Sequence, residues 1–257
     1  MLLDAELERY SRQLLLPAVD LLGQTRLKNA HVSLVGIGGL GCTVATLLAS
    51  SGVGHLRLID PDRVELSNLQ RQVLYRETDI GQYKALAALA HLLQLNSHVQ
   101  YSARSERLDT NNMAGLLAGS DLILDCSDNL ATRELINRHC QQQSINLIQG
   151  SALQRHGEVL DLPLASAKVG CYQCVYPPHP RQHQPSCREA GVWAPLLAIV
   201  GGLQAQLALQ RLLDSAQSAS SLYRYDGHLV QFKRFVVHPD PDCDCGSKRS
   251  QALEARH

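Results

Sequence analysis

A glycine-rich turn constrains the fold of this chain more than any other feature. Gly36, Gly38 and Gly41 form the pattern G-x-G-x-x-G. Residues 31–36 before the turn are apolar and β-branched, which predicts a buried strand, and residues 40–51 carry leucine and valine at helical spacing. Glycines at a strand–helix junction let the backbone approach a phosphate, and the helix N-terminus offers free N–H groups to it. The pattern predicts an α/β fold with a Rossmann-like doubly wound sheet that binds a nucleotide.

The next predicted strand, residues 55–60, ends on an acid. Asp60 follows the glycines by about 20 residues, where a ribose-binding carboxylate belongs. Three classes of function fit these features: an NAD-dependent oxidoreductase, an ATP-dependent adenylating enzyme, and a non-catalytic module that binds zinc and a nucleotide. The fold does not choose among them, because function depends on the residues of the site.

Four charged residues favour ATP. An enzyme that releases pyrophosphate needs positive charge around the phosphates and a carboxylate for magnesium. Arg12, Arg71 and Lys84 supply the charge, and Asp128 ends a predicted strand over 121–128, at the sheet edge where doubly wound folds bind ligands. A lone Lys or Arg is more often an ordinary surface charge. Hydride transfer does not require these four residues together, so their joint presence favours adenylation.

Several motifs resemble the MoeB/ThiF family of adenylating enzymes, which are related to ubiquitin-activating enzymes. The resemblance covers nearly the whole chain, and the run Ser-Asn-Leu-x-Arg-Gln is its most specific element; the matching stretches are residues 8–13, 36–41, 67–72, Lys84, 125–129 and Thr132-Arg133. It implies an adenylyltransferase acting on the C-terminal glycine of a small ubiquitin-like sulfur carrier that ends in Gly-Gly. It further implies ATP, Mg²⁺, a separate sulfur donor and a homodimer.

The resemblance also implies roles for individual residues. Asp60 would hold the ribose, Asp128 would bind magnesium, and Arg12 would reach the triphosphate bound by the other subunit. Phosphate and adenosine contacts would come from the glycine turn and its neighbours, namely Gly36, Gly38, Gly39, Gly41, Asp62, Ser67, Asn68, Arg71, Lys84 and Asn129. Positioning and charge stabilisation are the main tasks, so this step needs no protein nucleophile. A MoeB-like role in molybdenum cofactor synthesis is favoured, and a ThiF-like role in thiamine synthesis is the alternative.

Four of the eight cysteines form two short pairs. Cys171 and Cys174 are spaced C-x-x-C, and Cys243 and Cys245 are spaced C-x-C, where the family has C-x-x-C. No signal peptide is visible at the N-terminus, so we expect a cytoplasmic protein without a disulfide framework. The pairs predict a four-thiolate Zn²⁺ site, which would be structural because it leaves no open position. The alternative is free thiols in a poorly ordered tail.

The remaining cysteines are assigned differently. Cys187 lies beside a Pro-rich segment, residues 176–185, predicted to be a mobile loop. Ubiquitin-activating relatives form a thioester at this position, and adjacent Arg188 would favour a thiolate, so a covalent role and no role remain equally open. Cys42, Cys126 and Cys140 are expected to fill the core.

The 257 residues fit one domain. We expect an N-terminal arm (1–30), a nucleotide-binding half (31–150), a carrier-binding and zinc half (151–246) and a disordered tail (247–257). Equal numbers of basic and acidic residues, 24 each, argue against nucleic acid, and no apolar run suggests a membrane span. Further elements are predicted at 82–95 and 195–213 (helices), at 99–103 and 146–150 (strands), and at 221–225 and 229–237, an antiparallel pair joined by Asp226-Gly227.

Overall fold

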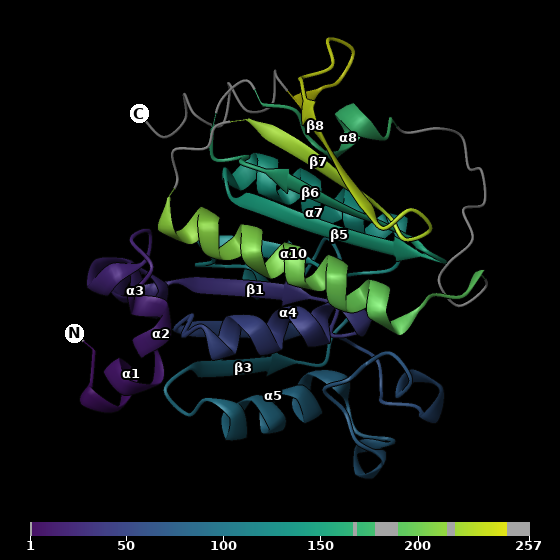
Figure 1. Cartoon of the computed structure of the whole chain (residues 1–257). Helices are drawn as coiled ribbons and strands as arrows, with labels where there is room; N and C mark the ends of the chain where they lie inside the picture. The colour runs from purple at the N-terminus through teal and green to yellow at the C-terminus, as the bar shows by residue number, and fades with distance from the viewer. Residues whose placement is uncertain (1, 167–168, 178–189, 215–218, 246–257) are drawn as a thin grey trace.

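The protein is built on one eight-stranded sheet (Figure 1). The computed structural model describes residues 2–166, 169–177, 190–214 and 219–245. The strand order is β3-β2-β1-β4-β5-β6-β7-β8. The strands are β1 His31–Val35, β2 His55–Ile59, β3 Gln100–Arg104, β4 Leu122–Asp125, β5 Asn146–Leu153, β6 His156–Leu162, β7 Ser220–Asp226 and β8 Gln231–Val237.

The first five strands are parallel, as the sequence predicts. Val35 is in register with Ile59 of β2 and with Asp125 of β4. The chain builds β1, β2 and β3 in one direction and then returns to add β4 on the other side of β1. Such a switch point opens a crevice at the carboxyl ends of the strands, where doubly wound folds bind their ligands. The predicted fold class is confirmed.

Helices cover both faces of the sheet. The face that carries Val32 and Leu34 packs against α4 Gly39–Ser50, α5 Lys84–Leu95 and α10 Ala194–Leu213, and Figure 1 shows α10 lying in front of the sheet. The opposite face, which carries Val35 and Ile123, packs against α6 Met113–Leu116 and α7 Leu130–Gln143. Successive residues of each strand therefore pack into two separate cores, one on each face of the sheet. This explains why the sequences of these strands are continuous apolar runs.

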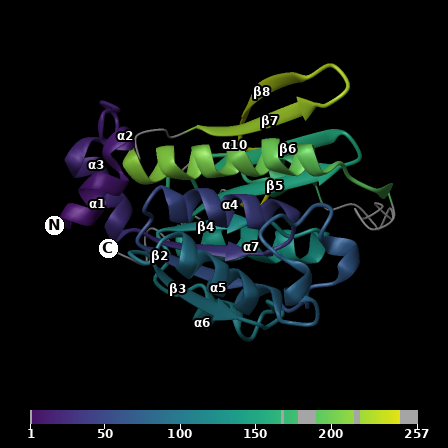
Figure 2. The ribbon, with the colours of Figure 1, turned by 60° about the horizontal axis from the view of Figure 1, so that its bottom comes forward.

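Three helices precede the sheet and gather beside the amino ends of its strands (Figure 2). They are α1 Asp4–Arg9, α2 Ser11–Leu14 and α3 Asp20–Asn29. Gln13 Nε2 donates to the Ser51 carbonyl, 3.0 Å away, and Asn96 Nδ2 donates to the Tyr10 hydroxyl at 2.8 Å. Ser51 and Asn96 directly follow α4 and α5. The arm is therefore fixed at the end of the fold remote from the glycine turn.

The antiparallel part is larger than predicted. Strand β6 pairs with β5 and β7, so three strands close the sheet, whereas the sequence pattern identified only the last two. Strand β8 begins at Gln231 rather than at residue 229, and β4 ends at Asp125, so that Cys126 and Asp128 follow the strand instead of belonging to it. The predicted mobile loop falls partly, and the predicted tail wholly, outside the described residues.

Helix α10 corrects one expectation. By length and composition it could cross a membrane. Half of its apolar stretch, however, is buried inside the fold. Gln204 on this helix is fully buried and donates to the Asp125 carbonyl at 3.2 Å. The core helix of a globular domain meets the same criterion, so α10 is weak evidence for a span.

Candidate nucleotide and metal sites

The glycine turn is as tight as the motif predicts. Gly36 has a φ of +89°, and a Cβ there would lie 2.9 Å from the Cys126 carbonyl group. A Cβ on Gly41 would lie 2.0 Å from the Gly36 carbonyl oxygen, so no larger residue fits. At Gly38, by contrast, the nearest described neighbour of a Cβ would be Gln72 Nε2 at 3.7 Å. The turn thus needs Gly36 and Gly41 for its own packing, whereas a Cβ on Gly38 would make only an ordinary contact.

The loop after β2 supports this turn. Asp60 is 5% exposed, and its two oxygens accept from the Ile37 N–H at 2.7 Å and from the Asp62 N–H at 2.8 Å. Burial raises its pKa, against the attraction of Lys84. Lys84 Nζ lies 3.1 Å from Asp62 Oδ2. The structure therefore brings Asp60, Asp62 and Lys84 together beside the turn, with Asp60 shaping the turn itself.

The Ser-Asn-Leu-x-Arg-Gln run lies on the other side of the turn. A Cβ on Gly39 would lie 3.3 Å from the Arg71 carbonyl oxygen. The Arg71 guanidinium donates to the Ser67 carbonyl at 2.8 Å, and Asn68 Oδ1 accepts from the Glu65 N–H at 3.2 Å. These bonds fold Leu66–Asn68 into a 3-10 turn. The Arg71 backbone therefore borders the turn, and Asn68, which is buried, has a structural task.

Asp128 borders the turn from the β4 side. The Gly36 backbone contacts the peptide that joins Cys126 to Ser127, and the exposed Asp128 is the next residue. In the part of the chain that the structure describes, the Asp128 carboxylate has no salt-bridge partner. Asn129 Oδ1 accepts from the Thr132 N–H at 2.9 Å and caps helix α7. An exposed carboxylate beside a phosphate-type turn suits Mg²⁺, which binds through few carboxylates and substrate phosphates.

Sequence reasoning missed a buried polar cluster behind Asp128. Asp125 is fully buried and accepts from Gln149 Nε2 at 2.6 Å, and Arg133 reaches the Ser127 carbonyl at 2.9 Å. Gln72, 4% exposed, lies beside Gly38 instead, and its Oε1 atom has no partner among the described residues. The only sequence signal was the polar run Asp125–Asn129 followed by Arg133, which gives no contact by itself.

Arg12 lies far from the glycine turn of its own chain. It is exposed on α2, and the arm contacts the carboxyl end of α4, whereas the turn is at the amino end of that helix. Twelve helical residues span about 18 Å. The structure therefore does not bring Arg12 to the turn within one chain.

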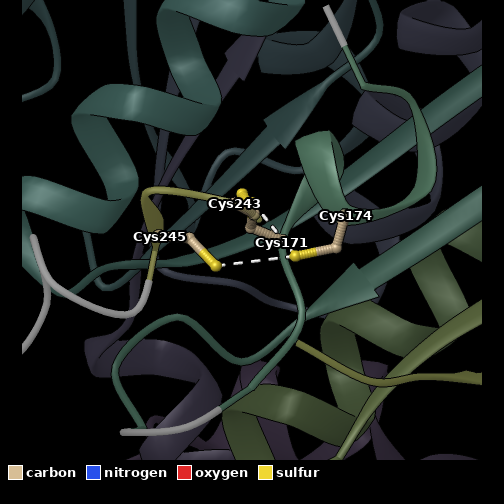
Figure 3. Close-up of side chains that lie close together, drawn as sticks. All are labelled: Cys171, Cys174, Cys243 and Cys245. Carbon is tan, nitrogen blue, oxygen red and sulfur yellow. Dashed lines mark hydrogen bonds between the residues drawn. The ribbon is translucent and has the colours of Figure 1, made fainter. Parts of the chain in front are cut away.

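The four paired cysteines converge (Figure 3). Their sulfurs all lie within 4.8 Å of one another, with 3.7 Å between Cys171 and Cys243, and 3.5 Å between Cys174 and Cys245. Zn–S bonds of about 2.3 Å in a tetrahedral site imply S–S separations of about 3.8 Å. The shorter C-x-C pair therefore still places both of its sulfurs at distances that suit a tetrahedral site. The cluster could hold a metal ion.

The pKa values of the thiols distinguish Cys174 of the cluster from the cysteines of the core. The Asp240 N–H donates to Cys174 Sγ at 3.4 Å, and the hydrogen bond between Cys174 and Cys171 lowers the Cys174 pKa to about 4. Burial raises the pKa of Cys42 to about 12 and also raises those of Cys126 and Cys140. These three are buried, as predicted for core residues. Cys187 lies outside the described residues.

Comparison with known proteins identifies the family. The ThiF family model matches residues 10–246. The chain belongs to the ThiF family. A Thermus thermophilus sulfur carrier protein adenylyltransferase is 42% identical over 252 residues, which cover 96% of this chain and 93% of that protein. A Salmonella typhimurium molybdopterin-synthase adenylyltransferase is 39% identical over 245 residues, 95% of this chain and 98% of the relative.

Two further comparisons bear on the alternatives. An Escherichia coli sulfur carrier protein ThiS adenylyltransferase is 37% identical over 251 residues, covering 97% of this chain and 99% of that protein. A crystal structure of Escherichia coli MccB matches with a TM-score of 0.81 at 23% identity, covering 93% of this chain and 72% of MccB, which supports the fold. Relatives named adenylyltransferases cover nearly the whole chain, so the predicted resemblance is confirmed and the oxidoreductase alternative loses its support.

Proposed function

We propose that this protein adenylates the C-terminal glycine carboxylate of a small ubiquitin-like sulfur carrier in molybdenum cofactor biosynthesis. The proposal is supported by the placement of Arg71, Lys84 and Asp128 on segments that border one glycine turn, in a chain whose relatives are named adenylyltransferases. A carrier oxygen attacks the α-phosphorus of ATP. The new P–O bond forms as the bond to the β-phosphate breaks, and the products are acyl-adenylate and pyrophosphate.

The side chains of the site have tasks that follow from their charge. Lys84 and Arg71 would hold the phosphates and stabilise the charge that builds up on the leaving pyrophosphate. Asp60 would bind the ribose through the lone pairs left by its two backbone bonds. Asp128 would hold Mg²⁺, which neutralises phosphate charge when bound. The exposed side chains Ser67 and Asn129, with Asp62, would line the same space.

The active unit would be a homodimer. Each arm would carry its Arg12 to the triphosphate held by the partner subunit, because the arm lies at the wrong end of α4 to serve its own chain. We also propose that residues 31–150 bind the nucleotide and residues 151–246 the carrier. The cysteine cluster would bind Zn²⁺ and fix the end of this second half to helix α8 Tyr172–Val175. A separate protein would donate sulfur, and a reducing cytoplasm would suit the free thiols.

The test is ATP–pyrophosphate exchange with Mg²⁺ against carriers that end in Gly-Gly. Exchange with a molybdenum-pathway carrier, lost in Asp128→Ala, supports the proposal. Exchange with a thiamine-pathway carrier alone would support the second candidate, which the 37% identity to the ThiS adenylyltransferase favours almost as well. Exchange with none of the carriers would contradict both.

A further inference from the structure

The backbone of Ser127, the residue before Asp128, is held from two sides by charged side chains. Asp125 Oδ1 accepts from the Ser127 N–H at 2.9 Å. Arg133 Nη2 donates to the Ser127 carbonyl at 2.9 Å and lies 3.4 Å from the Gly150 carbonyl. Both backbone hydrogen-bonding groups of Ser127 are therefore fixed by side chains.

These two side chains are themselves well anchored. Asp125 ends β4 and is fully buried, and its second oxygen accepts from Gln149 Nε2 of β5 at 2.6 Å. Arg133 lies in the first turn of α7, whose amino end is capped by Asn129. These contacts connect Ser127 to β4, β5 and α7. Its backbone is therefore fixed relative to both the sheet and a helix.

Asp128, in contrast, has no side-chain partner in the part of the chain that the structure describes. Its side chain is exposed, and among the described residues no cation pairs with it. The direction of its carboxylate therefore depends on the backbone that carries it. We propose that Asp125 and Arg133 act as positioning residues, a clamp on the Ser127 backbone that aims Asp128 at Mg²⁺. This rests on the proposed function, which gives Asp128 its metal.

The structure predicts that Asp125 acts through its hydrogen bonds rather than its charge. In Asp125→Asn the remaining carbonyl oxygen can still accept from Ser127. Gln149 Oε1 has no partner in the described part of the chain, so reversing the Gln149 amide lets it accept from the new NH₂ group. Asp125→Asn should therefore preserve the clamp. Arg133→Met removes one side of it, and Arg133→Lys keeps the charge on a shorter side chain in place of the Nη2 atom that reaches both carbonyls.

Two measurements on the full chain test the clamp. The first is the rise in melting temperature caused by ATP with Mg²⁺, compared with ATP and EDTA. The second is the Mg²⁺ concentration that half-saturates ATP–pyrophosphate exchange. Arg133→Met should keep the rise with ATP and EDTA, lose the extra rise with Mg²⁺, and raise the half-saturating Mg²⁺ at least about 10-fold, as expected for loss of a group that orients a metal ligand. Arg133→Lys should be intermediate and Asp125→Asn close to native.

Arg138→Met is the matched control, because Arg138 is exposed on the same helix; it should behave as native. A native Mg²⁺ response in Arg133→Met would overturn the clamp. So would loss of ATP binding in EDTA, since Arg133 would then contact the nucleotide. If Arg133→Met unfolds, the comparison of Arg133→Lys with Asp125→Asn decides, and an equal defect in both overturns the clamp. If native protein shows no exchange, the proposed function fails, while the melting measurement still decides the clamp.

Discussion

Lys84 Nζ lies 3.1 Å from Asp62 Oδ2, and the Lys84 N–H donates to the Asp62 carbonyl at 2.9 Å. The pair joins the loop after β2 to the first turn of α5. The Lys84 side chain is only 6% exposed, while that of Asp62 is 39% exposed. A nearly buried ammonium group, held beside the glycine turn by a solvated partner, is placed to stabilise phosphate charge.

Lys84→Met tests this placement. Pyrophosphate exchange should fall by about 10²–10³, the usual cost of removing a preorganised charge-stabilising group. The free energy of unfolding should change by only about 1 kcal/mol or less, because Asp62 can be hydrated when its partner is lost. Lys28→Met, which breaks the Lys28–Glu6 pair in the arm, is the control and should leave exchange unchanged. Equal exchange rates for both variants would remove Lys84 from the site.

The pKa of Asp125 predicts how stability depends on pH. Burial raises this pKa above its ordinary value of 3.8, although Arg133 acts against the shift. The folded state therefore binds the proton more readily, so the contribution of Asp125 to stability is fully present below pH 3.8 and is lost as pH rises through the raised pKa. Asp125→Asn should thus be more stable than native protein at neutral pH, with an advantage that shrinks as pH falls.

Urea unfolding from about pH 4 to pH 8 measures this difference. Asp226→Asn is a control of opposite sign. The N–H groups of His228 and Leu229 lower the pKa of Asp226, so its contribution to stability is present at neutral pH and lost as pH falls through the lowered pKa. An Asp125→Asn variant that is less stable than native at neutral pH would contradict the assignment.

The cysteine cluster predicts one bound zinc ion per chain. Cys174→Ala and Cys245→Ala should each lose the metal and lower the melting temperature, because four thiolates join α8 to the segment after β8. Cys140→Ala, in the core but outside the cluster, should retain full metal content. Metal analysis of the purified proteins measures the zinc content of each variant. Native protein without zinc, with all four thiols titratable, would refute the site.

Arg12 and Asp128 predict complementation between subunits. Arg12→Ala and Asp128→Ala should each be nearly inactive alone. In a mixed dimer, one site receives Asp128 from one chain and Arg12 from the other. Random exchange of subunits in an equal mixture should restore about a quarter of native activity. No recovery, in mixtures shown to contain mixed dimers, would place Arg12 outside the partner's site.

The sequence predicted the nucleotide half more fully than the rest. Strand and helix alternate there with strong apolar runs, and the glycine turn fixes their junction. Strand β6 was missed because Glu158 and Asp161 interrupt its apolar pattern, although Asp161 is buried against Arg211 at 2.6 Å. The contacts of Asp125 with Gln149 join residues 24 positions apart, so no local pattern could indicate them.

The most direct test of adenylation follows the label of ATP into the carrier. Protein, Mg²⁺ and a Gly-Gly carrier are incubated with ATP labelled at either the α- or the γ-phosphate, and the carrier is isolated under acid. We expect α-label to become bound to the carrier and γ-label to leave as pyrophosphate, and Asp128→Ala should transfer neither label. Transfer of γ-label, or no transfer to any carrier, would contradict adenylation.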